Sequence, residues 1–292
     1  MLGKLIKHDF KSLSRMLLPT LLVIFCVTVL GTLGLNFMVR NTFNTNTVGD
    51  GPLAAILNII SGIVFAFAIL GICAAFIFVA VVIFYRFYKS CIDNEAYLTF
   101  TLPVSASNIL WSKLITAVIW LLIGTLVGLL CLFIFLTFGT ADKGLINYEI
   151  VHAFRDAFTS KYLTGSVVWF IVEMVFYALI TSVAAVLQIF LALIIGGAVA
   201  QKHKLLAGIG FYFAINMIMG IISSIIQFIF VDNMDAIVIS SSNDIAGMEA
   251  FNAVISRMAQ YFVLPGMIIN LLMCVAFFLL TNYFMKNKLN LS

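Results

Sequence analysis

The sequence predicts an all-α, polytopic membrane protein with six transmembrane helices. Hydrophobic residues make up 63% of the 292 residues and charged residues only 10%, whereas soluble domains are about 45–50% apolar and about 25% charged. The apolar residues also gather in six stretches that are each long enough to span a bilayer. A chain of this composition needs lipid around it, and we expect a single transmembrane domain over residues 1–292.

The six stretches are continuous, and each reaches the roughly 20 apolar residues that a membrane span requires. The second and fourth are much longer, so we expect them to tilt, bend or extend beyond the bilayer. Neither is interrupted by a polar hairpin, and neither alternates as the strands of a membrane barrel do. The expected spans are residues 17–39, 55–85, 109–138, 166–200, 205–230 and 262–285.

Lysine and arginine predict the orientation, because they collect on the cytoplasmic side of membrane proteins. With the N-terminus inside, eleven of the 16 basic residues fall in cytoplasmic segments, and most acidic residues fall outside. Both termini are therefore expected in the cytoplasm. The eleven residues are Lys4, Lys7, Lys11, Arg15, Arg86, Lys89, Lys113, Lys202, Lys204, Lys286 and Lys288.

Three segments outside the spans have helical periodicity. Residues 2–15 have an apolar side and a basic side, which predicts an amphipathic helix over 1–16 at an anionic inner leaflet. Within an expected extracellular loop, 231–261, the apolar residues of 245–262 recur every three or four positions. We expect an interfacial or re-entrant helix there, before the last span. Segment 145–162 shows a weaker helical pattern.

The sequence lacks the motifs of the common enzyme and metal classes. It has no G-x-x-x-x-G-K-[ST] phosphate loop, so ATP binding by that route is not expected. Its histidines, His8, His152 and His203, are far apart and fall on different sides of the membrane, which excludes one shared metal site. Four of the five cysteines lie in apolar stretches, unlike a disulfide framework. We expect no enzyme activity, and neither a metal nor a cofactor in this chain.

Glu173 is the only formal charge well inside a predicted span. Such residues are costly in a bilayer and mark functional sites by default, so Glu173 is a candidate for the substrate path. The alternative is a protonated or interhelically bonded carboxyl group. We expect interhelical hydrogen bonds from the span amides Gln188, Asn216, Gln227 and Asn270.

The fifth span contains two pairs of small residues spaced by four. These pairs, Gly210 with Ala214 and Gly220 with Ser224, permit close helix approach. The approaching helix belongs either to the same chain or to a second copy.

The loop over residues 86–108, between the second and third spans, is the most informative segment. Pro103 ends one short element, and Ser105 or Ser107 is suited to cap the next helix. Apolar side chains at Leu98 and Leu102 are unexpected on a cytosolic loop and favour a docking surface. The alternative is packing against the N-terminal amphipathic helix.

This loop reads Glu95-Ala-Tyr97-Leu-Thr-Phe-Thr-Leu-Pro103-Val-Ser105, followed by Lys113. It resembles the corresponding loop of bacterial ABC transporter permeases of the type-2 exporter family. The opening residues, Met1-Leu-Gly-Lys-Leu-Ile-Lys-His-Asp-Phe10, are also similar to those of small Gram-positive members with six spans. With the six spans and the outer helix before the last one, the resemblance covers the whole chain.

The resemblance implies a permease subunit of an efflux system in the bacterial plasma membrane. ATP and Mg²⁺ would be held by separate ABC ATP-binding subunits, and a second permease chain would complete a homo- or heterodimer, with membrane lipid around it and no nucleic acid. The loop would carry the coupling helix, and residues 1–16 would form the connecting helix. The ATPase contacts would be Asp93, Asn94, Glu95, Tyr97 and Leu98.

The sequence departs from the family pattern at two positions of this loop. Glycine is common where it has Ala96, and a basic residue is common where it has Ala106. Two other functions stay open, an ion-coupled secondary carrier that uses Glu173 and a membrane scaffold or sensor that transports nothing. Transport without ATP would favour the carrier, and a complex that moves nothing would favour the scaffold.

Overall fold

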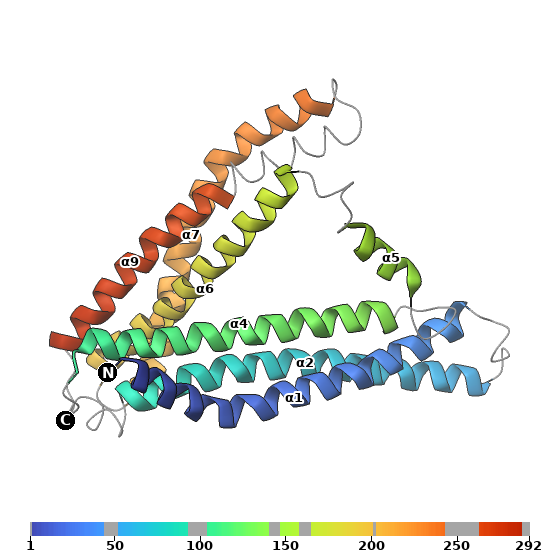
Figure 1. The fold of residues 1–292 in the computed structure, drawn as a ribbon, viewed down its shortest axis with the longest axis horizontal. Helices are drawn as coiled ribbons and strands as arrows, with labels where there is room; N and C mark the ends of the chain where they lie inside the picture. The colour runs from blue at the N-terminus through green and yellow to red at the C-terminus, as the bar shows by residue number, and fades with distance from the viewer. Residues whose placement is uncertain are drawn as a thin grey trace. The chain divides into compact units, whose positions relative to one another are not determined.

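The computed structural model describes residues 2–43, 52–92, 104–139, 147–157, 165–200, 203–242 and 263–287 (Figure 1). These residues are almost entirely helical, and no strand occurs among them. The helices are α1 (Leu2–Phe43), α2 (Pro52–Cys91), α4 (Ala106–Gly139), α5 (Tyr148–Ala157), α6 (Gly165–Val199), α7 (Lys204–Ser242) and α9 (Leu264–Asn287).

The predicted fold class is confirmed. Six helices (α1, α2, α4, α6, α7 and α9) are long and apolar enough to cross a membrane, and each corresponds to one predicted span. The chain is therefore a multi-pass membrane protein. Among these helices α6 is the most buried and α7 the least.

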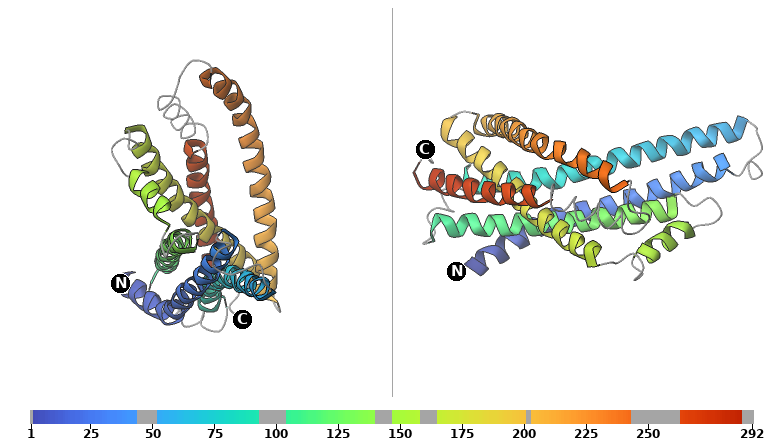
Figure 2. Two further views of the ribbon diagram at one scale, coloured as in Figure 1. Left: turned by 90° about the vertical axis from the view of Figure 1, so that its right-hand side faces the viewer. Right: turned by 90° about the horizontal axis from the view of Figure 1, so that it is seen from above.

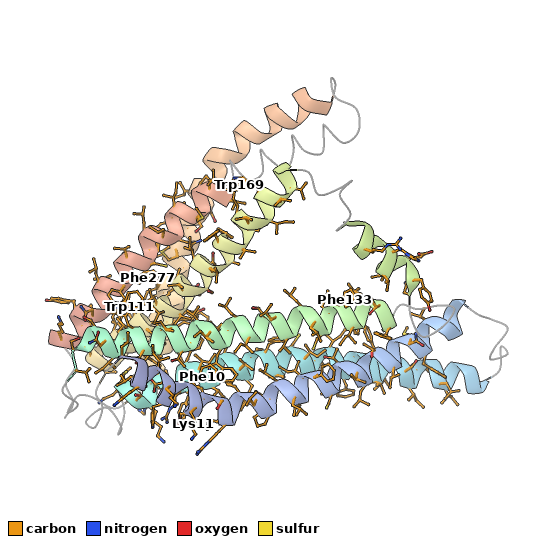
Figure 3. All side chains as sticks on the ribbon, viewed as in Figure 1. Phe10, Lys11, Trp111, Phe133, Trp169 and Phe277 are labelled. Atoms are coloured by element: carbon orange, nitrogen blue, oxygen red, sulfur yellow. The ribbon has the colours of Figure 1, made fainter. Side chains whose placement is uncertain are left out.

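The N-terminal amphipathic segment is helical, and it continues without a break into the first span as α1, with Pro19 inside the helix. At about 1.5 Å per residue its 42 residues extend about 63 Å. That is roughly twice the hydrocarbon thickness, so part of α1 lies outside it. The basic side of the segment is exposed at Lys4 and Lys7. Phe10 points toward α4, and Lys11 points away from it (Figure 3).

The chain forms two compact units. Unit 2 comprises Lys7–Ile83 and Ile119–Thr159, and it contains most of α1, most of α2, the larger part of α4, and α5. Its three long helices run alongside one another (Figure 2). Small residues allow α1 and α2 to pack closely, because a Cβ added at Gly31 would lie 2.5 Å from that of Ala68. Phe10 stacks on Trp120 of α4 with ring centroids 5.0 Å apart.

Unit 1 comprises Met1–Ile6, Phe84–Val118 and Ser160–Ser292. It joins the last turns of α2 and the first turns of α4 to α6, α7 and α9. Helix α6 packs against both α7 and α9. The core of unit 1 lies around the C-terminal half of α6, where Val186, Phe190 and Ile194 are fully buried.

The segments between the spans differ in part from expectation. The weak pattern over 145–162 corresponds to α5, whose N-terminus is capped by Asn147 through a 3.1 Å bond from the Glu149 amide to Oδ1. Helix α7 continues through 231–242, where the sequence predicted the start of a loop. The expected helix at 245–262 lies outside the described residues.

Candidate functional site

The five loop residues that the resemblance assigns to the ATPase contact, Asp93, Asn94, Glu95, Tyr97 and Leu98, lie outside the described residues. The structure does describe both flanks of the segment 93–103, up to Ile92 and from Val104. Both flanks belong to unit 1. The ends of the predicted loop 86–108 are themselves helical, as parts of α2 and α4.

The end of α2 packs on α6. Phe87 and Phe190 stack nearly parallel, with ring centroids 3.6 Å apart and an interplanar angle of 6°. Both side chains are almost completely buried. Five residues beyond Phe87, Ile92 occupies the space left by Gly197, since a Cβ added at Gly197 would lie 2.7 Å from Ile92 Cγ2. These contacts fix the entry to segment 93–103 against the C-terminal half of α6.

The start of α4 packs on α9. The carbonyl of Ser105 accepts a hydrogen bond from the amide of Asn108 (2.9 Å), as expected for the residue before a helix. The Ser107 hydroxyl instead donates to Asn282 Oδ1 of α9 at 3.0 Å. Trp111 lies on Phe278 with ring centroids 5.0 Å apart. The exit from segment 93–103 is therefore held by α9.

Basic residues lie at the end of unit 1 that contains the two flanks of segment 93–103. Helices α2 and α9 end there, while α4 and α7 begin there. These helix ends carry Arg86, Lys89, Lys113, Lys204 and Lys286. At the far end α7 carries acidic residues, Asp232 and Asp235. This difference in charge between the two ends of unit 1 agrees with the predicted orientation, in which basic residues lie on the cytoplasmic side.

Glu173 lies in α6, eight residues after its start at Gly165, or about 12 Å along the axis. The side chain is half-buried. Its Oε2 atom is buried and has no hydrogen-bond partner among the described residues. A buried polar atom without a partner costs about 1–3 kcal/mol, so a contact that compensates the charge of this carboxyl group would be favourable.

Helices α6 and α9 run in parallel along the face that follows Glu173. The ring of Tyr177 lies against Gly266, where an added Cβ would come within 3.0 Å of Cε2. One turn further, Asn270 Nδ2 donates to Thr181 Oγ1 at 3.3 Å. The thiol of Cys274 donates to the carbonyl of Ile180 at 3.6 Å. We call this contact, from Glu173 to Thr181 on α6 and from Gly266 to Cys274 on α9, the α6–α9 seam.

The predicted interhelical amides have mixed outcomes. The prediction is confirmed for Asn270, which bonds Thr181 of another helix. It is not shown for Asn216, whose Nδ2 donates to the carbonyl of Tyr212 in its own helix, at 3.3 Å. Gln188 is not shown to make such a bond, because its Nε2 is buried without a partner in the described part of the chain. The side chain of Gln227 lies outside the described residues.

The small-residue pairs of the fifth span do not bring another described helix close. A Cβ added at Gly210 or at Gly220 would have no described atom within 4 Å. The close approach involves two other glycines, since a Cβ at Gly196 of α6 would collide with the backbone of Gly208 in α7. Within the chain, α7 therefore crosses α6 near its own N-terminus.

Candidate metal ligands do not cluster in the described ranges, where no three His, Cys, Asp or Glu residues come together. None of the five cysteines forms a disulfide in the described structure, and Cys91 and Cys131 are buried. The site therefore offers mechanical anchoring through the flanks of 93–103 and one carboxyl group within the α6–α9 seam.

Reasoning from the sequence did not identify Phe87, Phe190, Tyr177 or Gly266 as site residues. The spacing of Glu173, Tyr177 and Thr181 was the available signal, because residues four apart share one helix face. No comparable signal existed for Phe87, in the predicted loop 86–108, or for Phe190, in a long apolar stretch.

Comparisons with protein-family models, with curated proteins and with solved structures found no match to this chain.

Proposed function

We propose that this chain is the permease subunit of an ATP-driven ABC exporter in a bacterial plasma membrane. Separate ATP-binding subunits would hold ATP and Mg²⁺ and act on the cytoplasmic loop 86–108. The six spans, the basic end of unit 1 and the resemblance of the loop to the coupling loop of type-2 exporters support this function.

The anchoring of segment 93–103 is the observation that carries the proposal. Its entry is fixed on α6 by the Phe87–Phe190 stack, and its exit is fixed on α9 by the Ser107–Asn282 bond. A loop held only by its own chain ends would absorb a push by bending. Here a displacement of the loop passes through close-packed side chains, which transmit strain because protein interiors have low compressibility.

The direction of energy flow follows from this arrangement. A partner shifts a conformational equilibrium only through contacts that differ between the two states. The ATPase would make such contacts with Asp93, Asn94, Glu95, Tyr97 and Leu98, and α6 and α9 would carry the change into the membrane. One chain of six spans would form half of the translocation path, so a second permease chain would complete it.

Co-purification tests the proposal. The full-length chain is isolated from its native membrane in mild detergent, and its partners are identified by mass spectrometry. A protein with a phosphate-binding loop is expected in stoichiometric amount, and the Glu95→Ala, Tyr97→Ala double variant is expected to lose it. The matched control is Tyr148→Ala with Glu149→Ala, which removes the same residue types from exposed positions of α5. Retention of the ATPase by both double variants would refute the loop assignment.

An ion-coupled carrier is the second candidate function, and the unpartnered oxygen of Glu173 favours it. A carrier would transport in vesicles without ATP and would stop on Glu173→Gln. The exporter requires ATP under the same conditions, so one vesicle assay with and without ATP separates the two functions.

A further inference from the structure

Two aromatic residues flank Glu173 on one face of α6. Trp169, Glu173 and Tyr177 are spaced by four residues, and each step of four rotates a position by only about 40° around the helix. The three side chains therefore form one short row near the N-terminal end of α6, where Trp169 is labelled in Figure 3. Trp169 is 66% exposed and Glu173 is half-buried, so the row is open at its outer end.

Helix α9 holds the inner end of the row in place. Gly266 leaves room for the Tyr177 ring, since an added Cβ would lie 3.0 Å from Cε2 and 3.4 Å from the hydroxyl oxygen. The Asn270–Thr181 hydrogen bond joins the two helices one turn further along. Tyr177 is thereby fixed beside Glu173, and the row is bounded on its inner side.

The chemistry of the row selects an organic cation. The Glu173 oxygen is buried and lacks a partner among the described residues, and a positive charge would satisfy it. Faces of Trp and Tyr attract cations, and aromatic groups around a charge are the usual receptor for quaternary ammonium. A calcium ion takes six to eight oxygen ligands, and a row with one carboxylate does not supply them.

We propose that Trp169, Glu173 and Tyr177 bind a lipophilic organic cation at the outer part of the α6–α9 seam. Glu173 supplies the counter-charge, Tyr177 supplies a fixed aromatic face, and Trp169 supplies a face at the open end. If the chain is the proposed exporter, this cation is the class of its cargo. Only the transport of the cation rests on that proposed function. Binding itself is independent of any ATPase.

Binding of tetraphenylphosphonium to the purified full-length chain in lipid nanodiscs tests the proposal. Tetraphenylborate has nearly the same size and shape with the opposite charge, so it is the matched probe. The cation is expected to bind and the anion is not. Glu173→Gln is expected to weaken cation binding roughly tenfold or more, because a charge-assisted contact becomes neutral. Glu149→Gln on α5 is the control and should bind as the wild type does.

The aromatic positions separate a binding role from a structural one. Tyr177→Phe keeps the aromatic face and should retain binding, whereas Tyr177→Leu should weaken it about threefold or more. Trp169→Ala, at an exposed position, should also weaken it without lowering the melting temperature. The Tyr177 and Trp169 variants test the proposal even if the Glu173→Gln variant does not fold.

Equal binding by the wild type and a folded Glu173→Gln variant would overturn the proposal, as would equal binding of the two probes or of the two Tyr177 variants. Cation binding by a chain that co-purifies with no ATPase would support the site and count against the exporter. Co-purification of an ATPase with a chain that does not bind the cation would support the exporter and overturn the proposed cation site.

Discussion

Gly196 of α6 and Gly208 of α7 lie so close that a side chain at either position would meet the opposite helix. A Cβ at Gly196 would collide with the backbone of Gly208, and a Cβ at Gly208 would lie 2.9 Å from the Leu193 side chain and 3.2 Å from its Cα. Backbone atoms cannot rotate away as a side chain does. The crossing of α6 and α7, which are joined by residues 200–203, therefore requires both glycines.

Gly196→Ala is expected to destabilise the protein by about 1–3 kcal/mol, because the added methyl group forces the two helices apart. Thermal unfolding in one detergent measures the effect. The control is Gly210→Ala on α7, where the added Cβ has no described atom within 4 Å. That change is expected to be neutral or to stabilise the helix by roughly 0.5–1 kcal/mol. Equal melting temperatures for the two variants would contradict the close crossing.

The bond between Asn270 and Thr181 is expected to couple the stabilities of α6 and α9. In a double-mutant cycle with Asn270→Ala and Thr181→Val, the interaction should be about 0.6 kcal/mol, a typical value for a membrane hydrogen bond. Asn216→Ala with Thr181→Val is the matched cycle and should give no coupling, because Asn216 bonds its own helix. A coupling of zero in the first cycle would show that the 3.3 Å contact contributes nothing.

The six spans were predictable because each depends only on the composition of its own segment. A run of about 20 apolar residues specifies a transmembrane helix whatever lies beside it. The same reasoning explains why α5 was predicted only weakly. It is a helix of 10 residues, with few positions to show a period.

The contacts between helices were not predictable in the same way. Lipid tails are as apolar as leucine, so hydrophobicity does not distinguish a helix face that meets protein from one that meets lipid. Gly210 and Gly196 are both small residues in apolar spans, yet in the described part of the chain only Gly196 lies at a crossing. Asn216 and Asn270 are likewise the same residue type in spans, and only Asn270 reaches another helix.

The candidate site was predictable in part. Glu173 was evident because a charge is rare in a span. Its aromatic neighbours Trp169 and Tyr177 follow from the period of the helix once Glu173 is chosen. The position of Gly266 beneath Tyr177 was not predictable, since it depends on the register of α6 against α9.

The Phe87–Phe190 stack is expected to transmit motion from the loop 86–108 into α6. Phe87→Leu keeps an apolar side chain but removes the parallel ring contact at 3.6 Å. The amount of cargo moved per ATP should fall at least about twofold in reconstituted vesicles, while the ATPase stays bound. Phe87→Ala is not suitable, because it would lower the free energy of unfolding by about 3–5 kcal/mol. A loss of folded protein could then not be told from a loss of coupling.

Phe65→Leu is the matched control for this measurement. Phe65 stacks on Phe135 within unit 2, with ring centroids 5.5 Å apart, whereas the flanks of segment 93–103 belong to unit 1. The ratio of transport to hydrolysis should not change. A similar loss in both variants would indicate a general effect of removing a phenylalanine from a span.

The orientation of the loop is expected to be cytoplasmic, and single added cysteines test it. Ser105 lies just before α4 and is exposed, and Tyr148 begins α5 and is exposed. In intact cells, a membrane-impermeant maleimide should label Tyr148→Cys and should label Ser105→Cys only after the cells are opened. The native cysteines lie in helices that span the membrane or are buried, so they should contribute little background. Labelling of Ser105→Cys in intact cells would put segment 93–103 outside, where no cytosolic ATPase can act on it.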